Sequence, residues 1–244
     1  MKQTPFTITE NAPVQKDTYR MVLAGDASAI TEAGQFVNLR LPENFLRRPI
    51  SVHDADGRSV TLLYKIAGRG TAQMAALPEG AVLDVLTGLG HGFQRSRAGK
   101  KPLLIGGGIG AAPLYFLAKQ LLAEGVRPTV LMGFNTASEL LCCDAFRTLG
   151  CETIVATADG SRGVRGFVTE ALPGDFSYFY ACGPTPMLKA LCAATSRSGE
   201  LSLEARMGCG FGACMGCTIQ TASGPRRICK DGPVFRREEL LWDD

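Results

Sequence analysis

Four cysteines near the end of the chain have the spacing of iron ligands. Cys209, Cys214 and Cys217 follow the pattern C-x4-C-x2-C, and Cys229 comes later as a solitary fourth cysteine. This is the plant-type spacing for a 2Fe-2S cluster. Glycines stand between these cysteines, and a loop wrapped round inorganic sulfides needs backbone amides that face inward without side chains in the way. We therefore predict that the four cysteines bind a 2Fe-2S cluster.

Structural zinc is the alternative for the same quartet. Four thiolates can hold zinc, but such sites usually combine two C-x2-4-C pairs. Here only Cys214 and Cys217 form such a pair, and the last ligand is solitary. The spacing therefore favours the cluster, and a non-enzymatic module that binds zinc stays as the second interpretation.

The cysteine count also bears on the compartment. The chain has nine cysteines, and residues 1–14 contain no continuous apolar stretch of the kind that secretory signals have. We therefore expect a cytoplasmic protein without a disulfide framework. Outside the quartet, Cys142, Cys143, Cys151 and Cys192 are expected to be small buried apolar residues.

A glycine-rich turn points to a nucleotide. Residues 106–113 read GGGIGAAP and stand between an apolar run and a helix-like segment. Read as G-x-G-x-x-A, the turn has the strand-turn-helix context of a pyrophosphate site, where amides at the start of the helix can face the phosphates. Tight packing of the strand on the helix is the alternative reason for such glycines. We predict that the glycines of this turn contact a dinucleotide: Gly106, Gly107, Gly108 and Gly110.

A second nucleotide signal is ACGPTPML at residues 181–188, an apolar strand that ends in Cys-Gly-Pro before a helix. Ligands bind at the carboxyl ends of strands in open α/β sheets. We predict that Cys182, Gly183 and Pro184 lie beside a nicotinamide, where a small polarizable Cys182 leaves room for ring stacking; a merely buried thiol is the alternative.

The sequence gives only a weak indication of whether the nucleotide is NAD or NADP. The next strand end reads MGFNTASEL, with neither an acidic residue nor an arginine at the place expected for ribose recognition. Because a 2'-phosphate lacks its usual arginine partner there, the sequence slightly favours NAD.

The elements that position these motifs change along the chain. From residue 6 to about residue 88, short runs of alternating or β-branched residues are separated by Gly, Pro, Asp and Asn, which predicts an antiparallel barrel or sandwich. From residue 102, apolar runs alternate with helix-like segments, which predicts a parallel sheet with crossover helices. After residue 201 the regular pattern fades. The expected fold class is therefore α/β plus β, with an antiparallel β domain at 1–98, a Rossmann-like α/β domain at 99–200 and a small cysteine-rich subdomain at 201–244.

Charge and hydropathy exclude two classes of partner. Lysine and arginine number 26 against 23 acidic residues, and a net charge of +3 is too small to mark a nucleic-acid surface. The longest uncharged stretch, residues 102–118, is interrupted by glycine and proline and falls short of the roughly 20 residues that a membrane span needs. We expect neither nucleic acid nor a membrane as partner.

The β domain adds two motifs, RRPISV at residues 47–52 and LLYKIAGRGT at residues 62–71. Together with GGGIGAAP, ACGPTPML and the cysteine quartet, in this order, they resemble the ferredoxin reductase superfamily. The chain is most similar to the electron-transfer subunits of NAD-dependent (class 1B) dihydroorotate dehydrogenases, over essentially its whole length. This resemblance implies a β-barrel domain that binds FAD, an α/β domain that binds NAD, and a subdomain that binds a 2Fe-2S cluster.

The resemblance also implies roles for single residues. Arg48 would pair with the FAD pyrophosphate, as suits its bidentate guanidinium, and Ser51 would hydrogen-bond near the flavin N5. Pro49 and Ile50 stand between them, and Ile50 cannot supply the aromatic stacking that many members have at this place. Further contacts to FAD are expected from the second motif: Leu63, Tyr64 and Lys65 at the ring, and Gly70 and Thr71 at the phosphates.

No residue is predicted to act as an acid or base. GLGHGF at residues 88–93 resembles a loop near the flavin, with His91 at its centre. Hydride transfer between a nicotinamide and a flavin needs no general base, so His91 and His53 are expected to be hydrogen-bonded structural residues.

The implied function is electron transfer between NAD(H), FAD, the 2Fe-2S cluster and a partner. A flavin belongs between the other two carriers because it exchanges both hydride and single electrons. The resemblance implies that the partner is the FMN-containing dihydroorotate dehydrogenase catalytic subunit of pyrimidine biosynthesis, in a heterotetramer with two of each chain. We expect the exposed side of the cysteine loop, including Phe211 and Met215, to dock near the partner's FMN.

Other flavoprotein functions stay open at this point. The chain could be a subunit of an electron-bifurcating NAD(P)/ferredoxin oxidoreductase or of a sulfide dehydrogenase, or a stand-alone reductase of soluble ferredoxin. Bifurcating relatives often have Asp in place of the first cluster cysteine, so Cys209 disfavours that branch.

Overall fold

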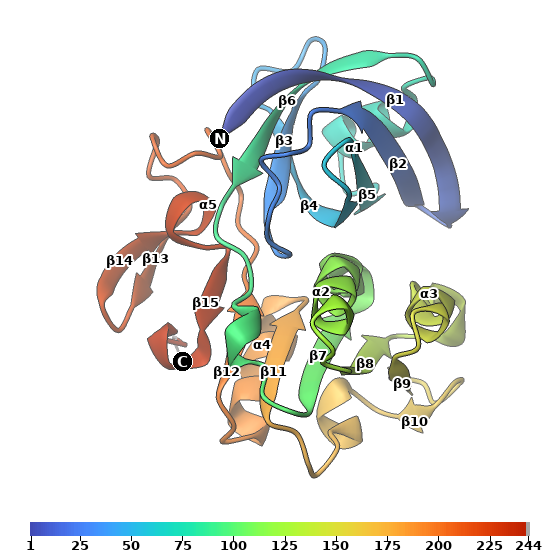
Figure 1. The fold of residues 1–244 in the computed structure, drawn as a ribbon, viewed down its shortest axis with the longest axis vertical. Helices are drawn as coiled ribbons and strands as arrows, with labels where there is room; N and C mark the ends of the chain where they lie inside the picture. The colour runs from blue at the N-terminus through green and yellow to red at the C-terminus, as the bar shows by residue number, and fades with distance from the viewer. Residues whose placement is uncertain (243–244) are drawn as a thin grey trace.

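A closed antiparallel barrel forms roughly the first third of the chain (Figure 1). This computed structural model describes residues 1–242. The strand order round the barrel is β1-β2-β5-β4-β3-β6, and closure leaves no sheet edge exposed. Alternate residues such as Phe6 and Ile8 point into the barrel, as the period of a strand requires. The elements are β1 (Lys2–Gln15), β2 (Thr18–Gly25), β3 (Phe36–Arg40), β4 (Arg48–Ala55), β5 (Ser59–Lys65), α1 (Arg69–Ala75) and β6 (Val82–Leu89).

A seven-stranded sheet follows, in the order β10-β9-β8-β7-β11-β12-β15. Its strands run parallel except β15, which pairs antiparallel with β12. Its strands are β7 (Pro102–Gly107), β8 (Thr129–Phe134), β9 (Glu152–Thr157), β10 (Val164–Arg165), β11 (Tyr178–Cys182), β12 (Gly199–Ser202) and β15 (Val234–Arg236). The helices between them are η1 (Arg95–Arg97), η2 (Gly108–Gly110), α2 (Ala111–Ala123), η3 (Ala137–Glu139), α3 (Cys143–Thr148), η4 (Val168–Ala171) and α4 (Thr185–Ala194).

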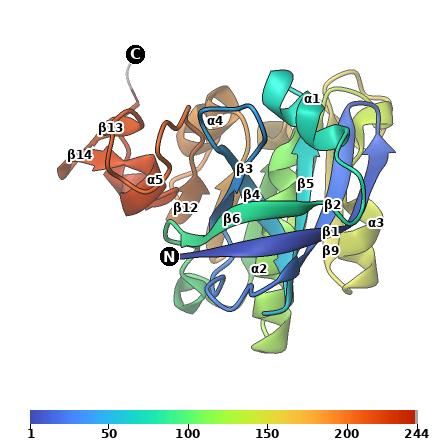
Figure 2. The ribbon, with the colours of Figure 1, turned by 90° about the horizontal axis from the view of Figure 1, so that it is seen from above.

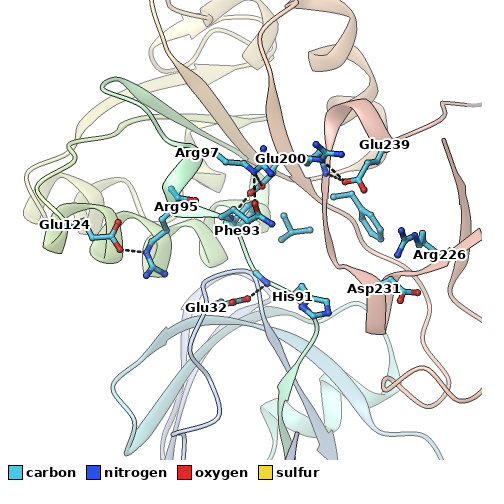
Figure 3. Close-up of a pocket in the computed structure, with 16 residues that line it drawn as sticks. Glu32, His91, Phe93, Arg95, Arg97, Glu124, Glu200, Arg226, Asp231 and Glu239 are labelled. Carbon is cyan, nitrogen blue, oxygen red and sulfur yellow. Dashed lines mark hydrogen bonds and ion pairs between the residues drawn. The ribbon is translucent and has the colours of Figure 1, made fainter. Parts of the chain in front are cut away.

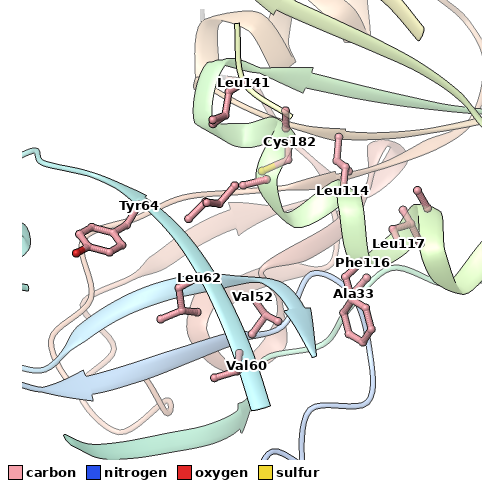
Figure 4. Close-up of a cluster of buried hydrophobic side chains, with 14 of the residues drawn as sticks. Ala33, Val52, Val60, Leu62, Tyr64, Leu114, Phe116, Leu117, Leu141 and Cys182 are labelled. Carbon is pink, nitrogen blue, oxygen red and sulfur yellow. The ribbon is translucent and has the colours of Figure 1, made fainter. Parts of the chain in front are cut away.

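The two faces of this sheet have different covers. On one face, α2 and α3 lie between the sheet and the barrel, and apolar side chains from all three share one core. Figure 4 shows this core, with Val52 and Leu62 from the barrel near Leu114 and Leu117 from α2. On the other face, α4 covers Leu103 and Ile105 of β7. The barrel and sheet are therefore joined by packed apolar surface rather than by a loose linker.

The cysteine-rich subdomain closes the chain. It contains the hairpin β13 (Thr218–Thr221) and β14 (Gly224–Arg227), the short α5 (Ile228–Asp231) and η5 (Arg237–Glu239). Figure 1 and Figure 2 both place the hairpin and α5 at the end of the molecule away from α3. The sequence predicted no regular secondary structure after residue 201, whereas β15 adds a strand to the sheet.

The fold class expected from the sequence is confirmed: an antiparallel barrel, a mostly parallel α/β sheet and a small cysteine-rich subdomain. The domain limits at 98 and 200 stay predictions. Among the residues that the structure describes, no helix combines the length and apolar character needed to cross a membrane.

Candidate functional site

A cavity of about 320 Å³ lies between the barrel and the carboxyl ends of β7 and β11. The barrel domain contributes eight lining residues, six of them predicted flavin contacts: Phe36, Pro49, Ile50, Ser51, Leu63, Tyr64, Lys65 and Ala67. The α/β domain contributes Gly110 and Cys182 among others. Most of the lining is apolar, so the cavity can hold a flat aromatic ring, and polar groups for its edge include Ser51, Lys65 and Glu204.

Arg48 and Gly70 meet outside this cavity, at the start of α1. A Cβ on Gly70 would lie 1.8 Å from Arg48 Nε, so only glycine leaves room for the guanidinium here. Arg48 donates to the Leu46 carbonyl at 2.5 Å and to Asn44 Oδ1 at 2.6 Å, both neutral oxygens. Its charge is therefore available to an anion. Thr71 Oγ1 accepts the Ala67 amide at 2.9 Å, which fixes the preceding turn.

The glycine-rich turn runs from β7 through η2 into α2. A Cβ on Gly106 would lie 2.7 Å from Ala111 Cα, and one on Gly110 would lie 2.3 Å from the Cys182 carbonyl oxygen. These two glycines allow close backbone packing. Gly107 and Gly108 instead line a second cavity of about 390 Å³, together with Pro184 of the Cys-Gly-Pro motif. Gly108 has open space beside it, whereas a Cβ on Gly107 would lie 2.4 Å from Met187 Sδ, so Gly107 both lines the cavity and packs closely.

Neighbouring residues of the same two loops line the two cavities. Gly107 and Gly108 line the second cavity while Gly110 lines the first. Likewise Cys182 lines the first cavity and Pro184 the second. The two cavities therefore lie against the same two loops, the one after β7 and the one after β11.

Glu139 is a carboxylate in the lining of the second cavity that the sequence interpretation missed. Its carboxylate accepts the Asn135 amide at 3.3 Å and Asn135 Nδ2 at 2.9 Å, directly after β8, and it lines the second cavity. No acidic residue was expected at this strand end, because Glu139 lies several residues beyond it. The 3-10 helix η3 folds the chain back and supplies the carboxylate at the place where dinucleotide-binding folds recognise ribose.

Cys182 is a neutral thiol in the wall of the flavin-sized cavity. It is 2% exposed, and burial raises its pKa to about 12. Gly183 follows in close contact, because a Cβ there would lie 2.6 Å from Met187 Cε. A small uncharged side chain at this point leaves the wall open to a stacked ring.

The four cysteines of the quartet form two pairs. The Cys214 amide donates to Cys209 Sγ at 3.4 Å, and the Cys209 amide to Cys214 Sγ at 3.5 Å. The Cys229 amide donates to Cys217 Sγ at 3.4 Å. Within residues 1–242, no three Cys, His, Asp or Glu side chains gather as ligands of one ion. Two pairs suit a cluster in which each of two irons takes two protein ligands.

Electrostatics at the quartet fit a bound cation. Burial opposes ionisation of Cys209, but amides of Phe211, Cys214 and Ala213 outweigh it and lower its pKa to about 6. Burial and the neighbouring Cys217 raise the pKa of Cys229 to about 12. Crowded thiols of this kind ionise together only when positive charge lies among them, as iron would provide. The donor set therefore fits the 2Fe-2S cluster.

The two histidines lie apart from each other. His53 is buried in β4, donates from Nδ1 to the Ala112 carbonyl at 2.7 Å, and stacks on Tyr115. Burial lowers its pKa. His91 lies instead in a polar cavity of about 590 Å³ where barrel, sheet and cysteine-rich subdomain meet. Figure 3 shows that charged side chains in this cavity pair with one another, as Arg95 does with Glu124.

Known proteins with the same architecture include oxidoreductases. A solved structure described as an NADH-dependent reduced ferredoxin-NADP oxidoreductase, a flavin-based bifurcating enzyme, is 30% identical with a TM-score of 0.88; the match covers 97% of this chain and 90% of that one. A ferredoxin NADP+ reductase from Neisseria gonorrhoeae, with bound FAD and NADP, is 20% identical with a TM-score of 0.68; that match covers 80% of this chain and 90% of that chain, and shows the fold alone.

Sequence comparison is more specific. The family model described as "Iron-sulfur cluster binding domain of dihydroorotate dehydrogenase B" matches residues 204–241. Two relatives named "Dihydroorotate dehydrogenase B (NAD(+)), electron transfer subunit" are each 42% identical: one from Shouchella clausii, covering 98% of both chains, and one from Fusobacterium nucleatum, covering 98% of this chain and 99% of the relative.

The barrel, the sheet and the two cavities beside the glycine-rich turn define a ferredoxin reductase-type flavoprotein oxidoreductase that transfers electrons. Its cofactors are FAD, NAD and a 2Fe-2S cluster. The chain belongs to the family of electron transfer subunits of dihydroorotate dehydrogenase B. The resemblance seen in the sequence is therefore confirmed, and a subunit of this kind acts with a catalytic partner subunit. The assignment of single residues to the cofactors stays a prediction.

Proposed function

We propose that this chain exchanges electrons between NAD(H) and an FMN-containing dihydroorotate dehydrogenase catalytic subunit, in a cytoplasmic heterotetramer with two of each chain. The partner would oxidise dihydroorotate to orotate in pyrimidine synthesis. Because that oxidation yields electrons, net flow in the assembly runs from the partner through the cluster and FAD to NAD+. NADH added to the isolated chain drives the same route in reverse.

One observation carries the proposal: the ring-sized cavity and the second cavity lie against the same two loops, at Gly108 to Gly110 and at Cys182 to Pro184. A nicotinamide held in the second cavity would therefore lie beside a flavin ring held in the first. When bound, FAD would supply exchange of both hydride and single electrons. The neutral Cys182 thiol adds neither charge nor bulk to the wall at this point.

In the barrel, Arg48 would hold the FAD pyrophosphate, and Gly70 keeps the space that its guanidinium needs. Ser51 lies in register opposite Phe36, both in the cavity wall, so its hydroxyl can bond an edge nitrogen of the ring. Leu63, Tyr64 and Lys65 would contact the ring from the neighbouring strand. Tyr64 is held by its hydroxyl, which donates to Asn11 Oδ1 at 2.9 Å.

In the α/β domain, Gly107 and Gly108 would approach the NAD pyrophosphate, since side chains there would narrow the second cavity. Glu139 would accept a ribose hydroxyl. Gly106, Gly110 and Gly183 would act by close packing of the two loops. This division refines the common role that the sequence suggested for all these glycines.

In the subdomain, Cys209 and Cys214 would bind one iron, and Cys217 and Cys229 the other, as their pairing suggests. When bound, the cluster supplies one-electron transfer. Phe211 is 45% exposed and Met215 is 54% exposed on the same loop. Large apolar side chains that stay exposed beside a redox centre favour docking of the partner there.

The test is anaerobic purification followed by iron, sulfide and flavin analysis and then titration with NADH. We expect iron and sulfide in equal amounts, FAD, and bleaching of the flavin and cluster absorbance by NADH. Cys217→Ser should lose the cluster, whereas Cys192→Ser, which removes a buried thiol outside the quartet, should keep it. Zinc in place of iron, or a flavin that NADH fails to bleach, would contradict the proposal.

A bifurcating oxidoreductase is the second candidate, favoured by the TM-score of 0.88 to such an enzyme. Co-purification distinguishes the two. An FMN-containing chain that converts dihydroorotate supports the first proposal, and a large chain that uses NADPH and ferredoxin supports the second.

A further inference from the structure

The outer face of the barrel at β3 and β6 is covered by the cysteine-rich subdomain. Phe36 pairs with Leu89 and Asn38 pairs with Leu86 across these strands, so the four side chains share one face. Phe36, Leu86 and Leu89 pack in one buried cluster with Cys217, Ile228, Cys229 and Phe235. Asn38 is the polar member of an otherwise apolar row, and such a residue needs a partner when buried.

Asn38 finds that partner in the cluster loop. It is 1% exposed, and its Nδ2 donates to the carbonyl oxygen of Cys209 at 3.1 Å. The loop presses closely on this amide. Gly210 has φ +78°, and a Cβ there would lie 2.4 Å from Asn38 Nδ2. Asn38 Oδ1 has no hydrogen-bond partner among the described residues, so the side chain is buried although only one end is satisfied.

The backbone of Asn38 is held as well. Arg47 Nη1 donates to the Asn38 carbonyl at 3.3 Å and to the Asp84 carbonyl at 3.0 Å, and its Nη2 pairs with Asp84 Oδ2 at 2.9 Å. Arg47 thereby ties β3 to β6 beside the point where the cysteine loop is bound. A rigid backbone at this point gives the side-chain amide a fixed direction.

The same strand reaches the flavin-sized cavity. Phe36 is in that cavity's wall and also packs in the cluster that contains Cys217 and Cys229. Two residues further along β3, Asn38 binds Cys209, the first cysteine of the other pair. One short strand thus touches the cavity and both cysteine pairs.

We propose that Asn38 is a positioning residue for the 2Fe-2S cluster, and that β3 fixes the cluster relative to the flavin through Asn38 and Phe36. The inference rests on the proposed role of the four cysteines as ligands. Asn38 does not touch iron in this scheme. Its amide holds the peptide of Cys209, and loss of that bond lets one end of the cluster loop shift while the flavin site stays intact.

The test compares Asn38→Leu and Asn38→Ala with wild type, in holoprotein purified anaerobically together with any partner chain. Both variants remove the donor; leucine keeps the volume and alanine avoids overpacking. The matched control is Thr87→Val on β6, because Thr87 is also fully buried with an unpartnered hydroxyl but lies outside the row that faces the subdomain. Readouts are the electron paramagnetic resonance spectrum of the reduced cluster, its loss to a chelator, and flavin bleaching by NADH.

We expect both Asn38 variants to show an altered resonance spectrum and roughly 10- to 100-fold weaker cluster retention, as for other residues that support a ligand. Flavin content and bleaching by NADH should match wild type, and Thr87→Val should match wild type throughout. Unchanged spectra and chelator loss in both Asn38 variants would overturn the inference, as would equal loss of flavin and cluster. Wild-type protein without iron would instead overturn the proposed function.

Discussion

Replacement of Gly70 by alanine should weaken FAD binding and leave the folding stability nearly unchanged. The new methyl would lie 1.8 Å from Arg48 Nε, so the guanidinium must leave its place over the start of α1. Because only the end of a flexible side chain has to move, the free energy of unfolding should fall little. Alanine also has up to about 1 kcal/mol more favourable helix propensity than glycine. FAD binding loses the charged hydrogen bonds of Arg48 to the pyrophosphate, each of about 1.5–3 kcal/mol.

Loss of one such bond weakens FAD binding by about 10- to 150-fold. The assay is titration of flavin-depleted protein with FAD, followed by quenching of flavin fluorescence, beside a thermal melt of the same sample. Gly68→Ala is the matched control, because it lies in the same turn in extended backbone and a Cβ there meets nothing within 4 Å. Equal FAD affinity in the two variants would refute the placement of Arg48 at the pyrophosphate.

Three further predictions concern the nucleotide, the partner and pH. Glu139→Gln should lower the KM for NADPH about 5- to 30-fold, because removal of a carboxylate relieves about 1–2 kcal/mol of repulsion on a 2'-phosphate. It should also raise the KM for NADH, because a neutral amide accepts a ribose hydroxyl less strongly than a carboxylate does. Steady-state kinetics measure both values, and unaltered values argue against the ribose role. Met215→Glu should weaken association with the partner at least about tenfold, as measured by ultracentrifugation. Val82→Glu is the control, because this barrel side chain is 64% exposed, and it should leave association unchanged. Equal effects of the two changes would count against docking at the cysteine loop. Burial lowers the pKa of His53 below 6.5, so below about pH 6.5 the unfolded chain binds a proton on this histidine more readily than the folded chain, and stability should fall as the pH drops. The melting temperature of His53→Gln should therefore depend less on pH below about 6.5 than that of wild type, and equal pH dependence would contradict this.

The motifs that the sequence could predict are those whose geometry is local. The C-x4-C-x2-C spacing, the glycine turn and Cys-Gly-Pro each sit within one loop, so residue types and spacing describe them fully. The barrel and the parallel sheet followed from hydrophobic periodicity. The division of the glycines into packing and cavity-lining positions did not follow, because it depends on how the β7 and β11 loops meet.

Residues that act across long sequence separations stayed hidden. Asn38 looks like an ordinary polar residue of a strand, and only the return of the chain at Cys209 gives its amide a partner. Glu139 was overlooked because η3 brings it back to the strand end. The three residues of β15 are too few to predict as a strand, yet their pairing with β12 decides where the subdomain lies.

The attachments of the subdomain bear on how electrons pass. Besides β15, the His91 amide donates to the Gly232 carbonyl at 2.7 Å and the Leu203 amide to the Pro233 carbonyl at 2.9 Å, so the subdomain is bonded both to the chain leaving the barrel and to the chain leaving the sheet. Elements bonded on several sides are among those that open least readily. The separation between a bound flavin and a bound cluster would therefore be set by the fold, and the nicotinamide would be exchanged at the second cavity. It follows that residues such as Asn38 should govern transfer between flavin and cluster, and residues such as Glu139 should govern exchange of the nucleotide.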